Sequence, residues 1–221
     1  MSLRKVQNNL YDEYAVSLEK SIGKSYAYPQ SYSVIKRFMD ITMAFTGLII
    51  SMPILLLFCI AIKLETPGPA FYLQERVGRN GKYFKVIKLR SMGVDAEKKG
   101  AQWAEINDPR VTKIGAFIRK TRIDEIPQLI NVLQGDMSMI GPRPERPIFT
   151  AQFNEEIPGF IKRLEVKPGV TGWAQVNGGY DITPNEKLEL DLFYIENRSI
   201  VLDVQIIFKT VRIVLTGEGA R

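Results

Sequence analysis

The 221-residue sequence predicts a mainly α-helical protein with a small β element, an α+β fold, in which one helix associates with a membrane. Residues 41–62 form an uninterrupted apolar run, which is typical of a membrane helix. Two short segments, 71–73 and 83–90, are rich in aromatic and β-branched residues and indicate strands. Beyond residue 91 the apolar residues follow mainly helical spacing, which Pro-Gly and Asp-Pro turns interrupt.

The chain is long enough for one domain with an appendage and a substantial hydrophobic core. Its first residues are polar and rich in Ser, Tyr and Asn. We therefore expect three parts: a polar N-terminal tail at 1–35, a membrane helix at 36–63, and a globular domain with interfacial amphipathic helices at 64–221.

The apolar segment has the length that a bilayer requires. Within residues 38–62 the only ionisable side chain is Asp40, near the start of the segment. At about 1.5 Å per residue, a helix over 41–62 covers a hydrocarbon core of about 30 Å. The alternative is a helix buried in the core of the domain.

The path of this segment through the membrane has two interpretations. Pro53 lies near its middle, two residues after Ser51, and a proline there removes one backbone hydrogen bond and kinks the helix. Basic residues flank the segment on both sides, and such residues mark the cytoplasmic side of a membrane segment. A re-entrant helix-break-helix would return both flanks to one side, whereas a bent helix would cross the membrane.

Two further elements are expected in the globular domain. Residues 71–73 and 83–90 would pair as strands around a Gly-containing loop at 77–81. Residues 200–215 mix apolar side chains with Asp, Gln, Lys and Arg in an amphipathic helical pattern. That helix either lies at a membrane surface or packs on the core of the domain.

Composition restricts the chemistry. The chain has no His and one Cys, which excludes Ser-His-Asp and Cys-His catalysis and zinc sites built from Cys and His. Any metal would be a hard cation held by carboxylates and phosphates, with Mg²⁺ the first choice and Mn²⁺ the second. The formal net charge of +6 favours polyanionic partners: nucleic acid, anionic lipid or phosphorylated small molecules.

Asp124 and Glu125 are the first candidates for chemistry. Pro127 is tolerated in a first helical turn, so the two carboxylates would sit at a helix start and could converge on one cation. Arg119 and its basic neighbours could meet phosphate oxygens. The alternative is structural, because Asp near a helix start is a common capping residue and Glu a partner of the helix dipole.

Two other segments could hold an anionic ligand. Arg143 stands between Pro142 and Pro144, which restrict the backbone and could preset the guanidinium for a phosphate or nucleotide. The glycines in residues 167–178 allow a ligand to approach the backbone closely. A rigid surface turn and ordinary glycine turns are the alternatives.

Taken together, these motifs resemble the bacterial sugar transferase family, the monotopic phosphoglycosyl transferases. The resemblance covers about residues 36–215 and looks like the small, minimal-domain form of the family. It rests on the order of six motifs: Lys-Arg-Phe-Met-Asp at 36–40, Lys-Val-Ile-Lys-Leu-Arg-Ser-Met at 85–92, Asp-Glu at 124–125, Gly-Asp-Met-Ser at 135–138, Gly-Pro-Arg-Pro at 141–144, and Pro-Gly-Val-Thr-Gly-Trp-Ala-Gln-Val-Asn-Gly at 168–178.

The resemblance implies an activity and a location. Family members transfer a sugar-1-phosphate from a UDP-sugar to undecaprenyl phosphate, release UMP, and form a covalent aspartyl-phosphosugar intermediate with the help of Mg²⁺. This reaction is the first membrane step in making bacterial polysaccharides or glycoconjugates. The resemblance also implies a re-entrant membrane helix and a catalytic domain on the cytosolic face of the bacterial inner membrane. Lipid bilayer and the two phosphorylated substrates would be the partners, nucleic acid would not, and a homo-oligomer is compatible with the sequence.

The family's functional residues map onto this chain by motif. The resemblance makes Asp124 the nucleophile and places Glu125 on Mg²⁺. It assigns the binding of phosphate and of the nucleotide sugar, or the lining of the site, to Lys88, Arg119, Pro142, Arg143, Pro144 and Asp191. The membrane break falls on Ser51 and Pro53, whereas many members have Ser directly before Pro. An Arg that often follows Asn-Gly in the family is replaced here by Gly179 and Tyr180.

Two rival functions use the same residues. A membrane-bound pyrophosphohydrolase would direct the Asp-Glu pair at a pyrophosphate, with water in place of the lipid acceptor. A non-catalytic membrane anchor would use its basic surface to recruit other proteins, but it would have no need of the motifs between residues 124 and 178.

Overall fold

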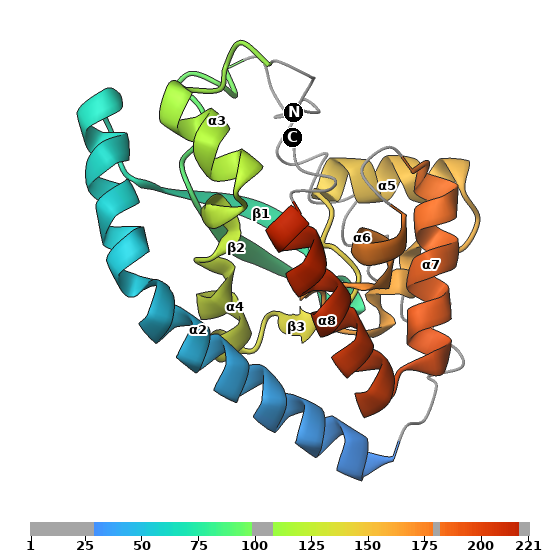
Figure 1. Ribbon diagram of the computed structural model, residues 1–221. Helices are drawn as coiled ribbons and strands as arrows, with labels where there is room; N and C mark the ends of the chain where they lie inside the picture. The colour runs from blue at the N-terminus through green and yellow to red at the C-terminus, as the bar shows by residue number, and fades with distance from the viewer. Residues whose placement is uncertain (1–28, 99–107, 179–181, 217–221) are drawn as a thin grey trace.

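The computed structural model describes residues 29–98, 108–178 and 182–216, and it shows a mainly helical protein with a small β content, as predicted (Figure 1). The strands form two small sheets. The helices and 3₁₀ turns are α2 (Gln30–Glu65), η1 (Arg79–Gly81), α3 (Lys113–Lys120), η2 (Ile123–Glu125), α4 (Gln128–Gln134), α5 (Pro147–Glu156), η3 (Phe160–Glu165), α6 (Trp173–Asn177), α7 (Pro184–Asn197) and α8 (Ile200–Thr216). The strands are β1 (Phe71–Val77), β2 (Tyr83–Leu89), β3 (Ser138–Ile140) and β4 (Gly169–Thr171). Most of the predicted tail, residues 1–28, lies outside the described residues.

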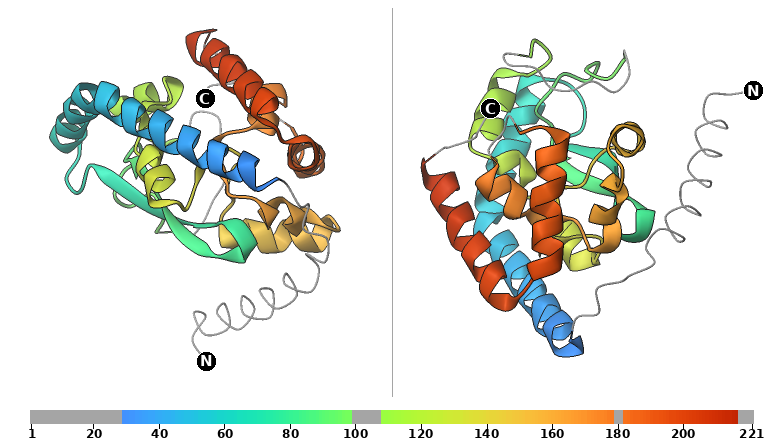
Figure 2. Two further views of the ribbon diagram at one scale, coloured as in Figure 1. Left: turned by 90° about the horizontal axis from the view of Figure 1, so that it is seen from below. Right: turned by 90° about the vertical axis from the view of Figure 1, so that its right-hand side faces the viewer.

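Helix α2 is long and curved and follows the outside of the molecule (Figures 1 and 2). It is long and apolar enough to cross a membrane, and only 6% of its most apolar 18-residue window is buried. The buried core helix considered from sequence is therefore not what forms. Large apolar side chains that α2 leaves exposed include Phe45, Ile50, Leu57, Ile60 and Leu64.

The helix begins at Gln30, before the predicted start at residue 36, and continues through Pro53 without interruption. Proline cannot donate a backbone hydrogen bond to the preceding turn. The hydroxyl of Ser51 donates to the carbonyl of Gly47 across 2.7 Å, a bond of the kind that accompanies helix bending. Ser51 and Pro53 thus lie within one continuous helix in this structure.

Polar side chains near the start of α2 attach it to the domain. The carboxylate of Asp40 accepts hydrogen bonds from the hydroxyl of Ser138 and the backbone N–H of Met139, both at 3.0 Å. Arg37 donates to the carbonyls of Val132 and Leu133 at the end of α4, at 2.7 and 3.0 Å. The two Arg37 bonds add donors at the end of α4, where the carbonyl of Val132 also accepts from the backbone N–H of Gly135.

Strands β1 and β2 form the predicted antiparallel hairpin, with Phe71 opposite Leu89 and Val77 opposite Tyr83. Asn80, with φ of 56°, reverses the chain between them in the left-handed conformation that Asn tolerates. Alternate residues of β2 point to one side because a strand has a period of two. On that side Phe84 and Val86 join the core formed by Leu129 and Val132 of α4 and Ala44 of α2.

A second, parallel pair was not predicted: β3 and β4 pair Ser138 with Gly169 and Ile140 with Thr171. Three residues are too few to display strand periodicity in a sequence. The pairing depends on close backbone approach at glycine, because a Cβ atom at Gly169 would lie 2.1 Å from the nitrogen of Gly141.

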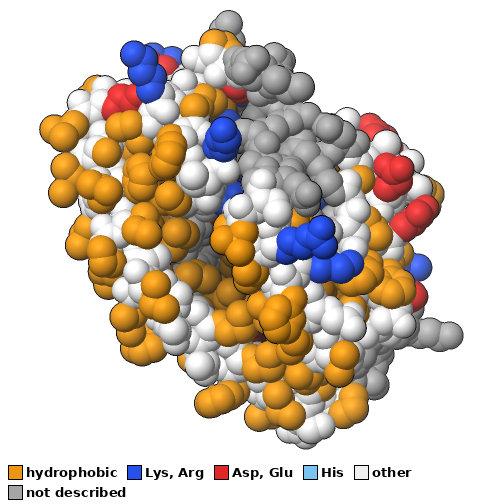
Figure 3. Space-filling view, viewed as in Figure 1, with side chains coloured by type: hydrophobic (Ala, Val, Ile, Leu, Met, Phe, Trp, Pro, Cys, Tyr) orange, Lys and Arg blue, Asp and Glu red, His pale blue; other side chains and the backbone are white. Residues whose placement is uncertain are grey.

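Helix α8 matches the predicted amphipathic helix, and one of its sides packs on the core of the domain. Leu202 and Ile206 are buried in a second core with Tyr194 of α7, while Val201 and Phe208 are exposed. Apolar side chains gather along α8 and α2 on the face that Figure 3 shows. This face is suited to contact with a lipid surface.

Candidate active site

Asp124 and Glu125 lie in the 3₁₀ turn η2, between α3 and α4. The chain leaves α3 through Arg122, whose φ of 57° is in the left-handed region, and enters α4 after Pro127. The pair is thus just before a helix rather than inside its first turn. Within the described residues, neither η2 nor α4 has a side-chain capping bond, so the capping role considered from sequence is not observed.

Glu125 is held by two cations. Its carboxylate accepts a hydrogen bond from the ammonium of Lys88 at 2.8 Å and from both terminal nitrogens of Arg143. Burial alone would raise the pKa of Glu125, but the charges and hydrogen bonds of Arg143 and Lys88 outweigh it and hold the pKa well below its ordinary value. Glu125 is therefore a permanent anion in the site.

Asp124 has a different environment, although it is the next residue. Its side chain is buried, with 7% of the residue exposed, and it accepts no hydrogen bond from the part of the chain that the structure describes. Burial, and next the negative charge of Glu125, raise the pKa of Asp124 to about 6, against the opposing effect of Lys88, Arg119 and Arg143. Asp124 is therefore mostly ionised at pH 7 and has carboxylate oxygens free for chemistry.

The structure brings together the predicted site residues Lys88, Arg119 and Arg143 around this pair. They come from β2, from α3 and from the loop after β3. Arg119 also donates from Nε to the hydroxyl of Ser91 across 3.0 Å, which orients its guanidinium. Three cations around one available carboxylate suit a ligand with several negative charges, such as a diphosphate.

Asp191 lies apart from this group. It is buried on α7, with 1% exposed, and its carboxylate is engaged by the guanidinium of Arg163, whose Nε donates across 3.0 Å. Pro142 and Pro144 flank Arg143, and their carbonyls accept hydrogen bonds from the rest of the domain rather than facing the Asp-Glu pair.

Sequence reasoning missed Asn131, which fixes β2 against α4. Its amide oxygen accepts from the backbone N–H of Ile87 at 3.0 Å, and its amide nitrogen donates to the carbonyl of Lys85 at 2.8 Å. These bonds hold the strand that carries Lys88 next to the turn that carries Glu125. The sequence contains no signal for them, because 44 and 46 positions separate the partners.

Arg76 and Arg163 were also missed. Arg76 donates to the carbonyl of Pro144 and lies 3.8 Å from the carboxylate of Glu145. The strand pattern could have indicated Arg76. Even-numbered residues of β1 point to one face of the sheet, and one of them, Tyr72, pairs with Lys88 of β2. Arg76 therefore lies on the same face of the hairpin as Lys88.

A divalent cation fits the Asp-Glu pair. No group of three or more acidic or Cys residues occurs within residues 29–98, 108–178 and 182–216. Mg²⁺, however, usually keeps several waters and takes only one or two carboxylates together with substrate phosphates. Asp124 and Glu125 supply two adjacent carboxylates of this kind, and the cations of Lys88, Arg119 and Arg143 lie near them.

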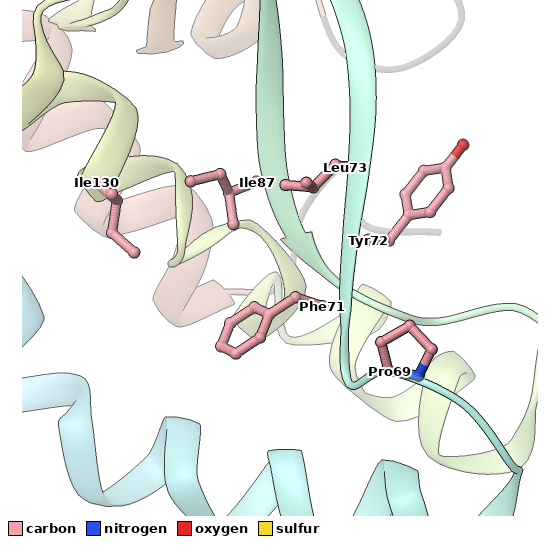
Figure 4. A pocket seen from close by; sticks show the side chains of 6 residues that line it. All are labelled: Pro69, Phe71, Tyr72, Leu73, Ile87 and Ile130. Carbon is pink, nitrogen blue, oxygen red and sulfur yellow. The ribbon is translucent and has the colours of Figure 1, made fainter.

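An apolar pocket of about 610 Å³ lies elsewhere on the hairpin (Figure 4). Its lining residues are Pro69, Phe71, Tyr72, Leu73, Ile87 and Ile130. None of them is a predicted site residue, and none carries a charge that could bind phosphate. The reactive groups are gathered at the Asp-Glu pair instead.

The departure from the family pattern at Gly179 and Tyr180 falls outside the described residues.

The chain is similar in sequence to known proteins. A family model described as bacterial sugar transferase matches residues 31–217. The chain is 50% identical over 193 residues, 86% of its length, to the UDP-N-acetylgalactosamine-undecaprenyl-phosphate N-acetylgalactosaminephosphotransferase of Aeromonas hydrophila. It is 44% identical over 183 residues, 80% of its length, to the UDP-glucose:undecaprenyl-phosphate glucose-1-phosphate transferase of Escherichia coli.

These matches span only 46% and 39% of the two relatives. A Bacillus subtilis protein is provisionally named undecaprenyl-phosphate N-acetylgalactosaminyl 1-phosphate transferase. It is 62% identical over 154 residues, which are 67% of this chain and 86% of the relative.

Proposed function

The chain belongs to the bacterial sugar transferase family, and we propose from this premise that it transfers a sugar-1-phosphate from a UDP-sugar to undecaprenyl phosphate and releases UMP. The observation that carries the proposal is the contrast between two adjacent carboxylates: Glu125 is held by Lys88 and Arg143, whereas Asp124 is free. The printed names of the relatives, which include UDP-sugars and undecaprenyl phosphate, support the choice of substrates.

The proposed reaction has two displacements at one phosphorus atom. A carboxylate oxygen of Asp124 attacks the phosphorus that carries the sugar, the bond to the UMP oxygen breaks, and UMP leaves with the electron pair. The product is an aspartyl-phosphosugar, an acyl phosphate. A phosphate oxygen of undecaprenyl phosphate then attacks the same phosphorus and releases Asp124 as a carboxylate. No proton transfer from an imidazole is needed, which is consistent with a chain without His.

Electrostatic repulsion is the main obstacle, because an anion approaches a phosphate in both steps. Lys88, Arg119 and Arg143 would neutralise charge on the diphosphate as it develops in the transition state. Asp124 and Glu125 would hold Mg²⁺, or Mn²⁺ in its place. When bound, this cation adds charge neutralisation at the phosphates. The permanent negative charge of Glu125 keeps the surrounding cations near Asp124.

We further propose that the protein lies on the cytosolic face of the bacterial inner membrane with α2 re-entrant. The exposed apolar side chains of α2, its curved course and the presence of Pro53 within it support this location (Figure 1). Basic residues at both ends of the helix, Lys36 and Arg37 before the apolar run and Lys63 after it, favour a return to the same side.

Labelling from each side of the membrane tests this topology. In a Cys59→Ser background, the exposed positions Ser31 and Thr216 are changed one at a time to Cys. Both thiols should react with an impermeant reagent only from the cytosolic side. Reaction of Ser31→Cys from the outside would show that α2 crosses the membrane.

Release of UMP tests the reaction. The purified protein in lipid nanodiscs is given a panel of UDP-sugars with and without undecaprenyl phosphate. Without the lipid we expect about one equivalent of UMP per protein, and continuous turnover only when the lipid is added. Continuous release without the lipid would instead identify a pyrophosphohydrolase, and no release with any donor would contradict the proposed function.

A further inference from the structure

We propose that Arg163 is a positioning residue: it fixes the backbone at Arg143 so that the Arg143 guanidinium meets the diphosphate of the sugar donor. The inference rests on the proposed function for the identity of the donor. Arg163 lies on η3, outside the motifs that the sequence singled out, and reaches the site only through the loop that it binds.

The loop at 142–145 has no helix or strand of its own, yet each of its carbonyls is occupied. The donors come from three separate parts of the domain: β4, η3 and β1. The carbonyls of Pro142, Arg143, Pro144 and Glu145 accept, respectively, from the backbone N–H of Gly169 at 2.9 Å, Nη2 of Arg163 at 2.9 Å, Nη1 of Arg76 at 2.9 Å and the backbone N–H of Val77 at 3.0 Å. Bonds from several directions hold a loop more firmly than its two prolines alone.

Arg163 supplies the bond nearest to the chemistry. Its guanidinium donates to the carbonyl of Arg143, the residue whose side chain contacts Glu125. Arg163 is 2% exposed, so it does not contact a substrate itself, and its guanidinium lies 4.9 Å from the centre of the Phe160 ring. A buried arginine that acts on a backbone carbonyl therefore sets the direction from which Arg143 enters the site.

Asp191 makes this arrangement possible. A buried cation is costly unless it is paired, and the Asp191 carboxylate accepts from both Nε and Nη2 of Arg163. The planar guanidinium can thus bind Asp191 and the Arg143 carbonyl at the same time, which a lysine ammonium cannot do with the same geometry. Asp191 then acts through Arg163, from α7, rather than by touching the donor.

A positioning role predicts a selective defect. Misdirection of Arg143 would weaken binding of the nucleotide diphosphate, whereas the lipid acceptor, which binds after UMP has left, would be little affected. A purely structural role would instead lower the amount of active protein, which reduces kcat and leaves both KM values unchanged.

The test uses Arg163→Lys, which keeps a positive charge beside Asp191 but loses the planar guanidinium that binds Asp191 and the Arg143 carbonyl together. The control is Lys162→Ala, at an exposed neighbouring position. The full-length protein in nanodiscs is assayed for the KM of the UDP-sugar and of undecaprenyl phosphate, and for UDP affinity by calorimetry. We expect about a tenfold rise in the donor KM and the UDP Kd for Arg163→Lys, an acceptor KM within about twofold, and no change for the control.

Unchanged UDP affinity in Arg163→Lys would overturn the inference while leaving the proposed function intact. Asp191→Asn provides a second variant in case Arg163→Lys does not fold, because it retains an acceptor for Arg163, and the same selective loss of UDP affinity is expected. If the folded Arg163→Lys variant has a reduced kcat but the same donor and acceptor KM values as the wild type, the role of Arg163 is structural alone. Failure of the wild type to bind UDP would contradict the nucleotide donor, and the inference with it.

Discussion

The ammonium of Lys88 donates to the carboxylate of Glu125 across 2.8 Å, although 37 positions separate the two residues in the sequence. The contact joins the second strand of the hairpin to the turn before α4. It gives Glu125 a partner that Asp124 does not have, and it helps to lower the pKa of Glu125, whereas the pKa of the neighbouring Asp124 is raised. Asn131 supports it, because its amide binds the backbone of β2 on both sides of Val86.

Replacing Lys88 should therefore reduce catalysis strongly. Lys88→Met removes a cation from the dyad while keeping most of the apolar stem, and loss of one preorganised charged donor typically costs about 100-fold or more in kcat. The matched control is Lys85→Met on the same strand, because the Lys85 side chain is exposed. Steady-state UMP release measures the effect, and a Lys88→Met enzyme within threefold of the wild type would refute this role.

The pKa of Asp124 predicts how the first half-reaction depends on pH. In the proposed reaction the nucleophile is the ionised carboxylate of Asp124, and burial together with Glu125 raises its pKa to about 6. The rate of UMP release in a single turnover without acceptor should therefore rise from pH 5 and level off above about pH 7. Stopped-flow or quenched-flow measurements at each pH check this profile. A rate that is flat between pH 5 and 7 would mean that no group with this pKa controls the step.

The same raised pKa predicts that Asp124→Asn stabilises the fold. Because the folded protein binds the Asp124 proton more tightly than the unfolded chain, ionisation destabilises the folded state as pH rises from the ordinary pKa of 3.8 to about 6, and the whole penalty is present above pH 6. At pH 7.5 we expect Asp124→Asn to gain on the order of 2 kcal/mol, or about 4–8 °C in Tm. At pH 4 the difference should largely vanish. A variant that melts lower at pH 7.5 would contradict the claim that ionised Asp124 destabilises the folded state.

The attachment of α2 can be tested through Asp40. Asp40→Ala leaves the Met139 N–H without its acceptor and removes one of the two acceptors near the buried Ser138 hydroxyl, the other being the carbonyl of Ile140. The expected loss is about 2–4 kcal/mol of unfolding free energy, which corresponds to a Tm lower by roughly 5–15 °C in nanodiscs. Ser31→Ala, at an exposed position of the same helix, should melt like the wild type. Equal melting of the two variants would show that Asp40 does not anchor the helix.

Much of the fold could be predicted because its signals are local. The apolar run of α2, the two strands around the glycine loop and the amphipathic pattern of α8 each extend over many residues. The β3–β4 pair could not be predicted, because each strand has three residues and the pairing depends on backbone approach between Gly141 and Gly169. The sequence predicted that the membrane helix begins at residue 36, six residues after the observed start of α2 at Gln30, because Ser31 to Ile35 lack the uniform apolar character of the segment that follows.

The site could be predicted only in part for a similar reason. Asp124, Glu125 and Arg143 stand in distinctive motifs, so their sequence context marks them. Arg163 and Asn131 occupy ordinary helical stretches, and their importance appears only when partners distant in sequence are brought within 3 Å. Asp191 was recognised as a site residue, but its burial behind Arg163 required the three-dimensional structure.

The most direct test of the central claim is intact-protein and peptide mass spectrometry after incubation with a UDP-sugar in the absence of undecaprenyl phosphate. The account predicts a mass increase of one sugar phosphate, located on the peptide that contains Asp124, absent from Asp124→Asn, and discharged when undecaprenyl phosphate is added. UMP release by the wild type without this adduct, or an adduct that persists in Asp124→Asn, would contradict it.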